Sequence, residues 1–359
     1  MGDKMGQYYR LDRLLSKKDI NGNTPEIYIV AGNRTAGKTF AIKEFMLRDF
    51  LKNGHQFMLQ FRKNYDISDC EKSFMDDLRD LFPHYDMHAE SERRGAYKVL
   101  YLTGGEFKEP LECGFATYLN AYESIKRAAS RFSGVYNRFM DEFQSENGDY
   151  IDREISKYMS IHYSIARGYG KQYRYVREFL ASNTFTKYNP YYIALGISER
   201  LEHNSKFVRG DGWVLEITNN DNARTLMLNS GFSKAFGGTS YVQSAAKNKH
   251  ILDNDAFVSA ENTRGMLYWG TIVFYNDESD APDKIAVYVG QNKCYVCSKV
   301  NSEHKRVITF NPRTHTEDTL LTSDNAELIR FFRDSFDRGF MYFESGKIKK
   351  IVLDIMRYS

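Results

Sequence analysis

An eight-residue glycine-rich segment near the start of the chain places the strongest constraint on its fold. The segment matches the P-loop pattern G-x-x-x-x-G-K-S/T and consists of Gly32, Asn33, Arg34, Thr35, Ala36, Gly37, Lys38 and Thr39. The preceding residues 26–31 are apolar and β-branched, as in a buried strand, and residues 39–53 carry apolar side chains at helical spacing. A strand, a glycine loop and a helix in this order form the context of a phosphate-binding P-loop, which predicts an α/β fold with a parallel sheet.

Each part of this segment suits the binding of a nucleotide. The two glycines let backbone N–H groups turn toward phosphate oxygens, and the N-terminus of the following helix adds partial positive charge. Lys38 is predicted to neutralise the β- and γ-phosphates, and the Thr39 hydroxyl to complete the coordination of a metal ion. We therefore expect ATP and Mg²⁺ as cofactors. The alternative is a chance turn before a helix, which the two flanks disfavour.

Residues 135–142 are predicted to supply the acidic groups that hydrolysis needs. The segment is β-like and ends in Asp141 and Glu142. Asp141 is expected to hold the metal ion, and Glu142 to polarise the attacking water. Asn137 and Arg138 make the segment less apolar than a central strand usually is. A strand that merely ends in solvated acids is the competing interpretation.

Two further predicted strands, residues 55–63 and 175–181, lead into polar side chains at the sheet edge where ligands bind in open α/β sheets. Side chains at this edge can hydrogen-bond a phosphate or the catalytic water. The candidates for nucleotide contacts are Arg62, Ser182, Asn183 and Thr184. An ordinary polar turn is the alternative for the last three.

The composition is that of a globular protein in a reducing cytoplasm. With 359 residues, 42% of them hydrophobic, the chain can form two domains with their own cores. Its apolar runs are too short to span a bilayer, and it has no signal-peptide pattern, so no membrane partner is expected. The net charge of +3 is spread evenly, and charge alone does not indicate nucleic-acid binding. Cys294 and Cys297 form a lone C-x-x-C in a β-patterned stretch, where packing on opposite faces of a strand is favoured over zinc or redox chemistry.

The order of these motifs resembles that of viral DNA-packaging ATPases, the terminase large subunit group. The shared features are the P-loop, the basic strand tip at residues 61–63, the sequence Met-Asp-Glu-Phe at 140–143 and the Ser-Asn-Thr sequence after 181. Residues 189–192 and the pattern of 339–357 are similar, in particular, to the compact ATPases of phi29-like bacteriophages. We predict that this last region forms a helix, a hairpin turning at residues 345–346 and a basic helix.

The resemblance implies a domain organisation. Residues 1–205 would form a P-loop ATPase domain of the ASCE type with a parallel sheet, residues 206–260 a linker, and residues 261–359 a smaller α+β RNase H-like domain that contacts nucleic acid or a portal. It also implies a ring, a pentamer in this group, that uses ATP to push double-stranded DNA through the portal of a preformed procapsid. The ring would act in the host cytoplasm, docked transiently at the portal vertex. Whether a packaging RNA takes part stays open.

Members of this group also use basic residues that act across a subunit interface. Arg167 lies where the arginine finger is expected, and Lys126 matches a second basic position. Arg174 and Arg177 remain alternatives to Arg167 because the spacing differs by an insertion before Tyr173. For each of these residues a solvated surface charge is the other interpretation.

The C-terminal part lacks the pattern of a nuclease. A two-metal nuclease site needs carboxylates clustered on adjacent strands. The interiors of the four predicted strands contain neither Asp nor Glu; these strands are 266–275, 284–289, 294–300 and 306–310. Asp277, Glu278 and Asp280 lie in a predicted hairpin loop, so no cutting activity is expected.

Three short basic groups, at 247–250, 304–306 and 347–350, would contact nucleic acid if they converged. Two other functions compete with a translocating motor: a P-loop enzyme such as a nucleotide kinase, and an adaptor that binds nucleotide only as a structural ligand. A kinase would be expected to have a lid and an acceptor pocket.

Overall fold

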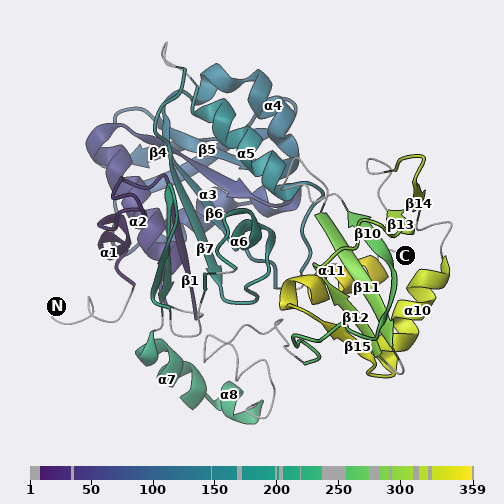
Figure 1. Ribbon diagram of the computed structural model, residues 1–359. Helices are drawn as coiled ribbons and strands as arrows, with labels where there is room; N and C mark the ends of the chain where they lie inside the picture. Colours follow the sequence, from purple (N-terminus) through teal and green to yellow (C-terminus); the bar gives the residue numbers. More distant parts are fainter. Residues whose placement is uncertain are drawn as a thin grey trace. The chain divides into compact units, whose positions relative to one another are not determined.

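The protein consists of two compact units, Met1–Ile251 and Leu252–Ser359 (Figure 1). The computed structural model describes residues 9–33, 36–146, 148–167, 172–198, 200–201, 205–218, 220–236, 256–274, 283–290, 293–309, 315–321 and 326–357. Each unit has its own sheet and hydrophobic core. Among the described helices, none has the length and apolar character needed to cross a membrane.

The first unit is built on a nine-stranded sheet with the strand order β3-β4-β5-β2-β6-β7-β1-β9-β8. The central strands are parallel; in spatial order they are β5 (Leu111–Tyr118), β2 (Gln56–Phe61), β6 (Val135–Asp141), β7 (Arg177–Asn183), β1 (Ile27–Gly32) and β9 (Trp213–Thr218). The antiparallel edge strands are β3 (Tyr85–Ser91), β4 (Tyr97–Gly104) and β8 (Phe207–Arg209). The parallel α/β fold predicted from the P-loop is therefore confirmed.

Helices cover both faces of this sheet, because successive residues of a buried strand point to opposite sides. In β1, Tyr28 and Val30 belong to one core, and Ile29 and Ala31 to the other. The first face is covered by α1 (Leu11–Leu15), α2 (Lys38–Asn53) and α3 (Cys70–Leu78), and the second by α4 (Tyr122–Arg127), α5 (Glu154–Ile165) and α6 (Pro190–Ala194) (Figure 1). Short 3-10 turns lie at Asn64–Ile67, Leu119–Ala121 and Ala129–Phe132.

The segment predicted to be a linker, 206–260, begins as part of the first unit. Strand β9 pairs in parallel with β1, and β8 pairs with β9. The linker prediction is wrong for residues 207–218, because Trp213 and Leu215 are buried in the second core and extend the sheet. Two helices follow, α7 (Asp221–Asn229) and α8 (Gly231–Ala235), and residues 237–255 lie outside the described residues.

The second unit has a six-stranded sheet with the order β14-β13-β10-β11-β12-β15. Its strands are β10 (Leu267–Phe274), β11 (Asp283–Gly290), β12 (Lys293–Cys297), β13 (Val307–Thr309), β14 (Thr319–Leu321) and β15 (Met341–Phe343). The first four confirm the predicted strands, with slightly different ends. Helices α10 (Ala326–Asp337) and α11 (Gly346–Arg357) pack on one face through residues such as Phe332 and Val352.

Two sequence interpretations can be tested in this unit. The hairpin predicted to turn at residues 345–346 is wrong: β15 is a single strand that pairs in parallel with β12, and α11 begins directly after it. The interpretation of the C-x-x-C sequence is confirmed, because Cys294 packs in the core beneath the helices and Cys297 in the cluster on the opposite face. Both are free thiols, and burial raises the pKa of Cys294 to about 12.

Candidate nucleotide-binding site

The P-loop joins β1 to α2 at the carboxyl-terminal edge of the parallel strands. Gly37 adopts a left-handed conformation, with φ of 86°, and precedes the first residue of α2. A Cβ atom at Gly32 would lie 2.2 Å from the carbonyl oxygen of Thr218. Both glycines of the motif are therefore required by backbone geometry. Arg34 and Thr35 lie outside the described residues.

The side chains of the loop are held by the protein itself. The buried Lys38 donates from Nζ to the carbonyl oxygens of Asn33, at 2.8 Å, and Gly32, at 3.3 Å. The Asn33 side chain pairs with the backbone of Asn220: its Nδ2 donates to the carbonyl at 3.1 Å, and its Oδ1 accepts from the N–H at 3.0 Å. Ala36 accepts a hydrogen bond from the N–H of Tyr9 at 2.9 Å. The backbone N–H groups of Asn33 and Ala36 are thus the groups that could make the predicted contacts with phosphate.

Thr39 and Asp141, predicted to share a metal ion, lie side by side. Thr39 Oγ1 donates to Asp141 Oδ2 at 2.8 Å. Burial raises the pKa of the Asp141 carboxyl, and the hydrogen bond from Thr39 offsets this only in part. A hydroxyl and a carboxylate are hard oxygen ligands of the kind that Mg²⁺ takes, and a cation would favour the charged form of Asp141. The two residues fit the expected metal ion.

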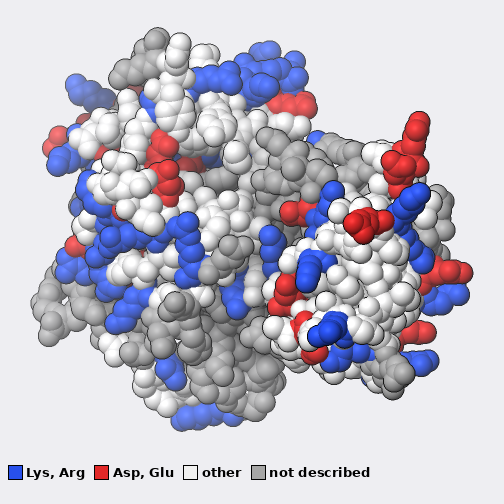
Figure 2. All heavy atoms as spheres, viewed as in Figure 1, with Lys and Arg blue, Asp and Glu red and all other residues white. Residues whose placement is uncertain are grey.

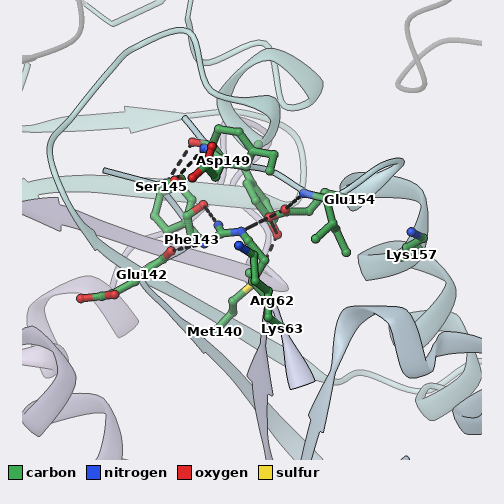
Figure 3. Close-up of polar contacts among 12 residues, drawn as sticks. Arg62, Lys63, Met140, Glu142, Phe143, Ser145, Asp149, Glu154 and Lys157 are labelled. Atoms are coloured by element: carbon green, nitrogen blue, oxygen red, sulfur yellow. Dashed lines mark hydrogen bonds and ion pairs between the residues drawn. The ribbon is translucent and has the colours of Figure 1, made fainter. Parts of the chain in front are cut away.

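Glu142 follows at the end of β6 in a conformation that few residues adopt. Its φ is 52°, in the left-handed region, and its side chain is exposed. For a residue other than glycine this costs on the order of 1–3 kcal/mol, and such strain is common at functional sites. Figure 3 shows its carboxylate pointing away from the Arg62 guanidinium, while its carbonyl accepts from Arg62 Nη1 at 3.2 Å. The hydrogen bond from Arg62 therefore holds the backbone of Glu142, while the Glu142 carboxylate stays exposed.

Arg62 has a different environment from the one predicted. Its Nη2 donates to the Phe143 carbonyl at 2.6 Å, and its Nε lies 3.0 and 3.1 Å from the two carboxylate oxygens of Glu154 (Figure 3). Tyr191 donates to the same carboxylate at 2.9 Å. The Arg62 side chain is only 13% exposed. Its donors are occupied by protein groups rather than directed toward a nucleotide, so the structure assigns it to the support of the loop that carries Glu142.

The Ser-Asn-Thr sequence, residues 182–184, lies between the strand that ends in Asp141 and the strand that leads into the P-loop. Strand β7 runs between β1 and β6, and its register places Ser182 beside Ala31 and Asn183 beside Gly32. The hydroxyls of Ser182 and Thr184 are buried, and neither has a hydrogen-bond partner among the described residues. Because an unpartnered buried hydroxyl costs free energy, these groups are suited to a ligand or an ordered water at this edge.

Comparison with known proteins agrees with this geometry. The family model described as "Podovirus DNA encapsidation protein (Gp16)" matches residues 3–359. The chain belongs to this family. The DNA packaging proteins of Bacillus phages PZA and phi29 are 23% and 22% identical to it over 354 residues, covering 98% of this chain and 97% of their own length. The resemblance predicted from the order of motifs is confirmed.

Solved structures show the same fold. A chain of "The bacteriophage Phi-29 viral genome packaging motor assembly" superposes with a TM-score of 0.67 at 21% identity, over 98% of this chain and 99% of that chain. A chain of "The Phi-28 gp11 DNA packaging Motor" gives a TM-score of 0.62 at 16% identity, over 98% of this chain and 96% of that chain. The two-unit architecture of this Gp16-family chain is therefore shared with motor proteins.

Arg167, predicted to act across an interface, lies far from the P-loop of this Gp16-family chain. Arg167 follows α5, and the backbone of the adjoining Ala166 accepts from Arg174 N at 2.9 Å, just before β7 begins. The seven residues of β7 span about 20 Å, so Arg167 lies at the opposite sheet edge from the nucleotide site. Arg167 is exposed and, within the described part of the chain, makes no hydrogen bond or ion pair.

The two alternatives to Arg167 are committed to contacts within the chain. Arg174 is buried, and its Nη2 donates to the carbonyls of Ile165, at 2.9 Å, and Phe132, at 3.1 Å. Arg177 Nη1 donates to Asn137 Oδ1 at 2.6 Å on the α2 side of the sheet. Their positions favour Arg167 as the residue available to a neighbour.

Lys126 lies on the outer surface of α4. Figure 2 shows Lys and Arg side chains gathered over this helix, at the top of the view, where Lys126 and Arg127 are exposed. Like Arg167, it is a surface cation, and its role across an interface stays a prediction.

Sequence reasoning missed the function of the polar residues inside β6. Arg138 is fully buried and pairs with Glu178 of β7, from Nη1 to Oε1 at 2.5 Å, and with Gln60. On the other face, Asn137 Nδ2 donates to Asp49 Oδ2 at 2.7 Å. Glu178, directly before the apolar residues 179–181 of β7, was the available signal, since a buried charge needs a partner of opposite sign.

Of the three predicted basic groups, one residue has a clear structural contact within the second unit. Lys349 is buried and donates to the carbonyl of Ala256 at 2.8 Å. The Arg306 guanidinium stacks 3.7 Å from the centre of the Trp269 ring. Residues 247–250 lie outside the described residues. Lys349 is thus a structural contact within its own unit rather than a phosphate contact.

Proposed function

We propose that the protein is an ATP-driven motor subunit that moves double-stranded DNA into a preformed procapsid, as a ring docked on the portal. The observation that carries the proposal is the hydrogen bond between Thr39 and Asp141. It joins the helix that follows the P-loop to the strand that carries the acids, so groups for phosphate, metal and water converge at one sheet edge. Family membership and the names of the relatives support DNA as the partner; its double-stranded form and the portal are part of our proposal.

The residues of this edge would divide the work of hydrolysis. Lys38 would exchange the carbonyls of Gly32 and Asn33 for phosphate oxygens. Thr39 and Asp141 would hold Mg²⁺, which neutralises charge on the phosphates when bound. Glu142 would accept a proton from the attacking water and orient it. The hydroxyls of Ser182, in β7, and of Thr184, just after it, would sense the γ-phosphate or this water.

Arg167 of one subunit would complete the site of the next. Its exposure and its distance from the P-loop of its own chain support an action in trans, and Lys126 is a second candidate. An arginine supplied in this way accelerates phosphoryl transfer by roughly 10³–10⁵ where it has been dissected. We propose a ring, with five subunits as the expected number.

We further propose that the second unit is an RNase H-like domain without nuclease activity that contacts nucleic acid or the portal. A mixed sheet supports this, with β10 parallel to β13 and antiparallel to β11. In the described strands of the sheet the one carboxylate is Asp283, at the first residue of β11. Cleavage of DNA in the presence of Mg²⁺ or Mn²⁺ would contradict this proposal.

DNA-stimulated ATPase activity with and without empty procapsids tests the motor function. We expect hydrolysis to rise when DNA and procapsids are both present. Glu142→Gln should still bind ATP but lose hydrolysis by about 10²–10⁴, together with DNA packaging. Glu106→Gln, an exposed residue in the turn between β4 and β5, is the matched control and should behave as the unmodified protein.

The same variant separates the other functions. An adaptor that binds nucleotide as a structural ligand would keep its activity in packaging when Glu142 is replaced. A kinase would transfer phosphate to small acceptors without DNA. Either result would overturn the motor proposal.

A further inference from the structure

A line of buried polar groups crosses the α5 side of the first unit, away from the P-loop. At its centre the Glu178 carboxylate accepts from Arg138 Nη1 at 2.5 Å and from the Tyr158 hydroxyl at 2.6 Å. Burial alone would raise the pKa of Glu178, but Arg138 and His162 outweigh it and lower that pKa to about 2. Glu178 is therefore a carboxylate that can only accept hydrogen bonds.

His162 of α5 continues this line toward the surface. Its Nδ1 lies 2.5 Å from Glu178 Oε1, and its Nε2 lies 2.9 Å from the Tyr173 hydroxyl. That hydroxyl donates its one proton to Glu26 Oε2 at 2.8 Å, so it must accept from His162. Glu178 and the Tyr173 hydroxyl thus hold the two ring nitrogens of His162, and Tyr173 is held from two sides, by His162 and Glu26.

Tyr173 and Arg174 adjoin each other at the far end of the segment that starts with Arg167. Arg174 N donates to the Ala166 carbonyl at 2.9 Å, which ties the two ends of that segment together. The guanidinium of Arg174 is bound to the carbonyls of Ile165 and Phe132. Both ends of the segment are thus attached to α5 and to the amino-terminal sheet edge, while Arg167 itself is exposed.

We infer that His162, Tyr173 and Arg174 form an anchor that positions Arg167 for its action on a neighbouring subunit. The inference rests on the proposed trans role of Arg167. An arginine that stabilises a transferring phosphoryl group must be held in place, and a displacement of 1 Å can cost about 100-fold in rate. These three residues touch no reacting atom; they are positioning residues. Since Arg138 lies on β6, the same line of groups also reaches the strand that ends in Asp141.

Tyr173→Phe tests the anchor with the smallest change. It removes the hydroxyl that joins His162 to Glu26, at a side chain that is already 47% exposed, so the fold should be kept. We expect the DNA-stimulated ATPase rate on procapsids to fall about tenfold, with unchanged KM for ATP. His162→Gln should show the same defect. Tyr163→Phe is the control: this tyrosine of α5 is 50% exposed, and its hydroxyl has no hydrogen bond among the described residues.

Mixed assemblies separate a positioning role from general damage to the variant's own site. A Lys38→Ala subunit cannot hydrolyse ATP, but its intact Arg167 can serve a Tyr173→Phe neighbour. In an equal mixture, half of the Tyr173→Phe sites gain such a neighbour, so their mean rate should rise about fivefold over the pure variant. Arg167→Ala mixed with Lys38→Ala is the reference and should be rescued in the same way.

The two proposals can fail separately. If Arg167→Ala is not rescued in the mixture, the trans role and the proposed hydrolysis mechanism are wrong. If Arg167→Ala is rescued and Tyr173→Phe is not, the defect lies in the variant's own site and the anchor is wrong. Unchanged activity of Tyr173→Phe and His162→Gln would also overturn the anchor.

Discussion

The two edges of the nine-stranded sheet are built in different ways. At the carboxyl-terminal edge, a continuous glycine loop and the ends of β6 and β7 place Thr39, Asp141 and Ser182 near one another. At the amino-terminal edge, the segment that begins with Arg167 is attached through side chains from separate parts of the chain, such as Glu26 and Tyr173. The first edge is defined by short motifs, and the second by tertiary contacts between residues without a motif.

This difference suggests a division of labour between subunits. Groups at the carboxyl-terminal edge would bind and hydrolyse a nucleotide within one chain. Groups at the amino-terminal edge would act on the nucleotide of the next chain. Variants at the first edge should therefore alter the isolated protein, whereas variants at the second should matter only in an assembly.

Arg167→Ala should give the largest effect at the amino-terminal edge. We expect DNA-stimulated hydrolysis on procapsids to fall by about 10³–10⁵, because the developing charge on the phosphoryl group loses its partner. ATP binding by the isolated chain should not change, since Arg167 lies about 20 Å from its own P-loop. Equilibrium binding of a fluorescent ATP analogue and steady-state ATPase rates measure the two quantities. Weakened nucleotide binding by the isolated variant would contradict the separation of the edges.

Arg138→Met should disturb the connection between the edges rather than either edge alone. It leaves Glu178 buried without its main cation, and breaking a buried pair costs about 3–5 kcal/mol. The free energy of unfolding, from urea denaturation, measures this. The double variant Arg138→Met with Glu178→Leu removes both charges and should recover part of the loss. A single variant as stable as the unmodified protein would show that the pair contributes little.

The sequence predicts the carboxyl-terminal edge well because local pattern determines it. The strand before the P-loop, the helix after it and the strand ending in Asp141 all occur where periodicity places them. The extension of the sheet by β8 and β9 was missed because β8 has only three residues and both strands lie in a segment whose glycines and asparagines suggest a linker.

Side-chain partners were harder to predict. The sequence places Arg62 at the nucleotide, but its guanidinium forms an ion pair with Glu154, 92 residues further along the chain. The amino-terminal edge has no sequence signal of its own, since its contacts join residues as distant as Glu26 and Tyr173. Such pairs form only once the strands have assembled into the sheet, and periodicity along the chain does not reveal them.

Ser182→Ala and Thr184→Ala should have smaller effects than the preceding variants. Each removes one buried hydroxyl that has no partner among the described residues, so the stability of the nucleotide-free chain should change little or rise. Loss of a hydrogen bond to phosphate or water should slow hydrolysis by about tenfold, the equivalent of roughly 1.4 kcal/mol. Thermal unfolding and ATPase rates, measured together, test this. A large loss of stability would mean that these hydroxyls serve the fold rather than the site.

Asp141→Asn should give the smallest change in stability, and of unusual sign. The pKa of this carboxyl is raised above its ordinary value of 3.8 in the folded chain, chiefly by burial. A group with a raised pKa contributes stability below its unfolded pKa and loses it as the pH rises through the folded pKa. At neutral pH the charged Asp141 therefore destabilises the nucleotide-free protein, and the uncharged amide should increase Tm slightly.

The dependence on pH makes this prediction specific. The gain in Tm from Asp141→Asn should be larger at pH 8 than at pH 5, and should be reversed when Mg²⁺ and ATP are present, because the cation then needs the carboxylate. Asp149→Asn, an exposed residue of the following loop, is the control and should change Tm little at either pH. A variant that is less stable than the unmodified protein at pH 8 without ligand would mean that the hydrogen bond from Thr39 outweighs burial. The charged Asp141 carboxylate would then stabilise the nucleotide-free protein, rather than destabilise it until a metal ion binds.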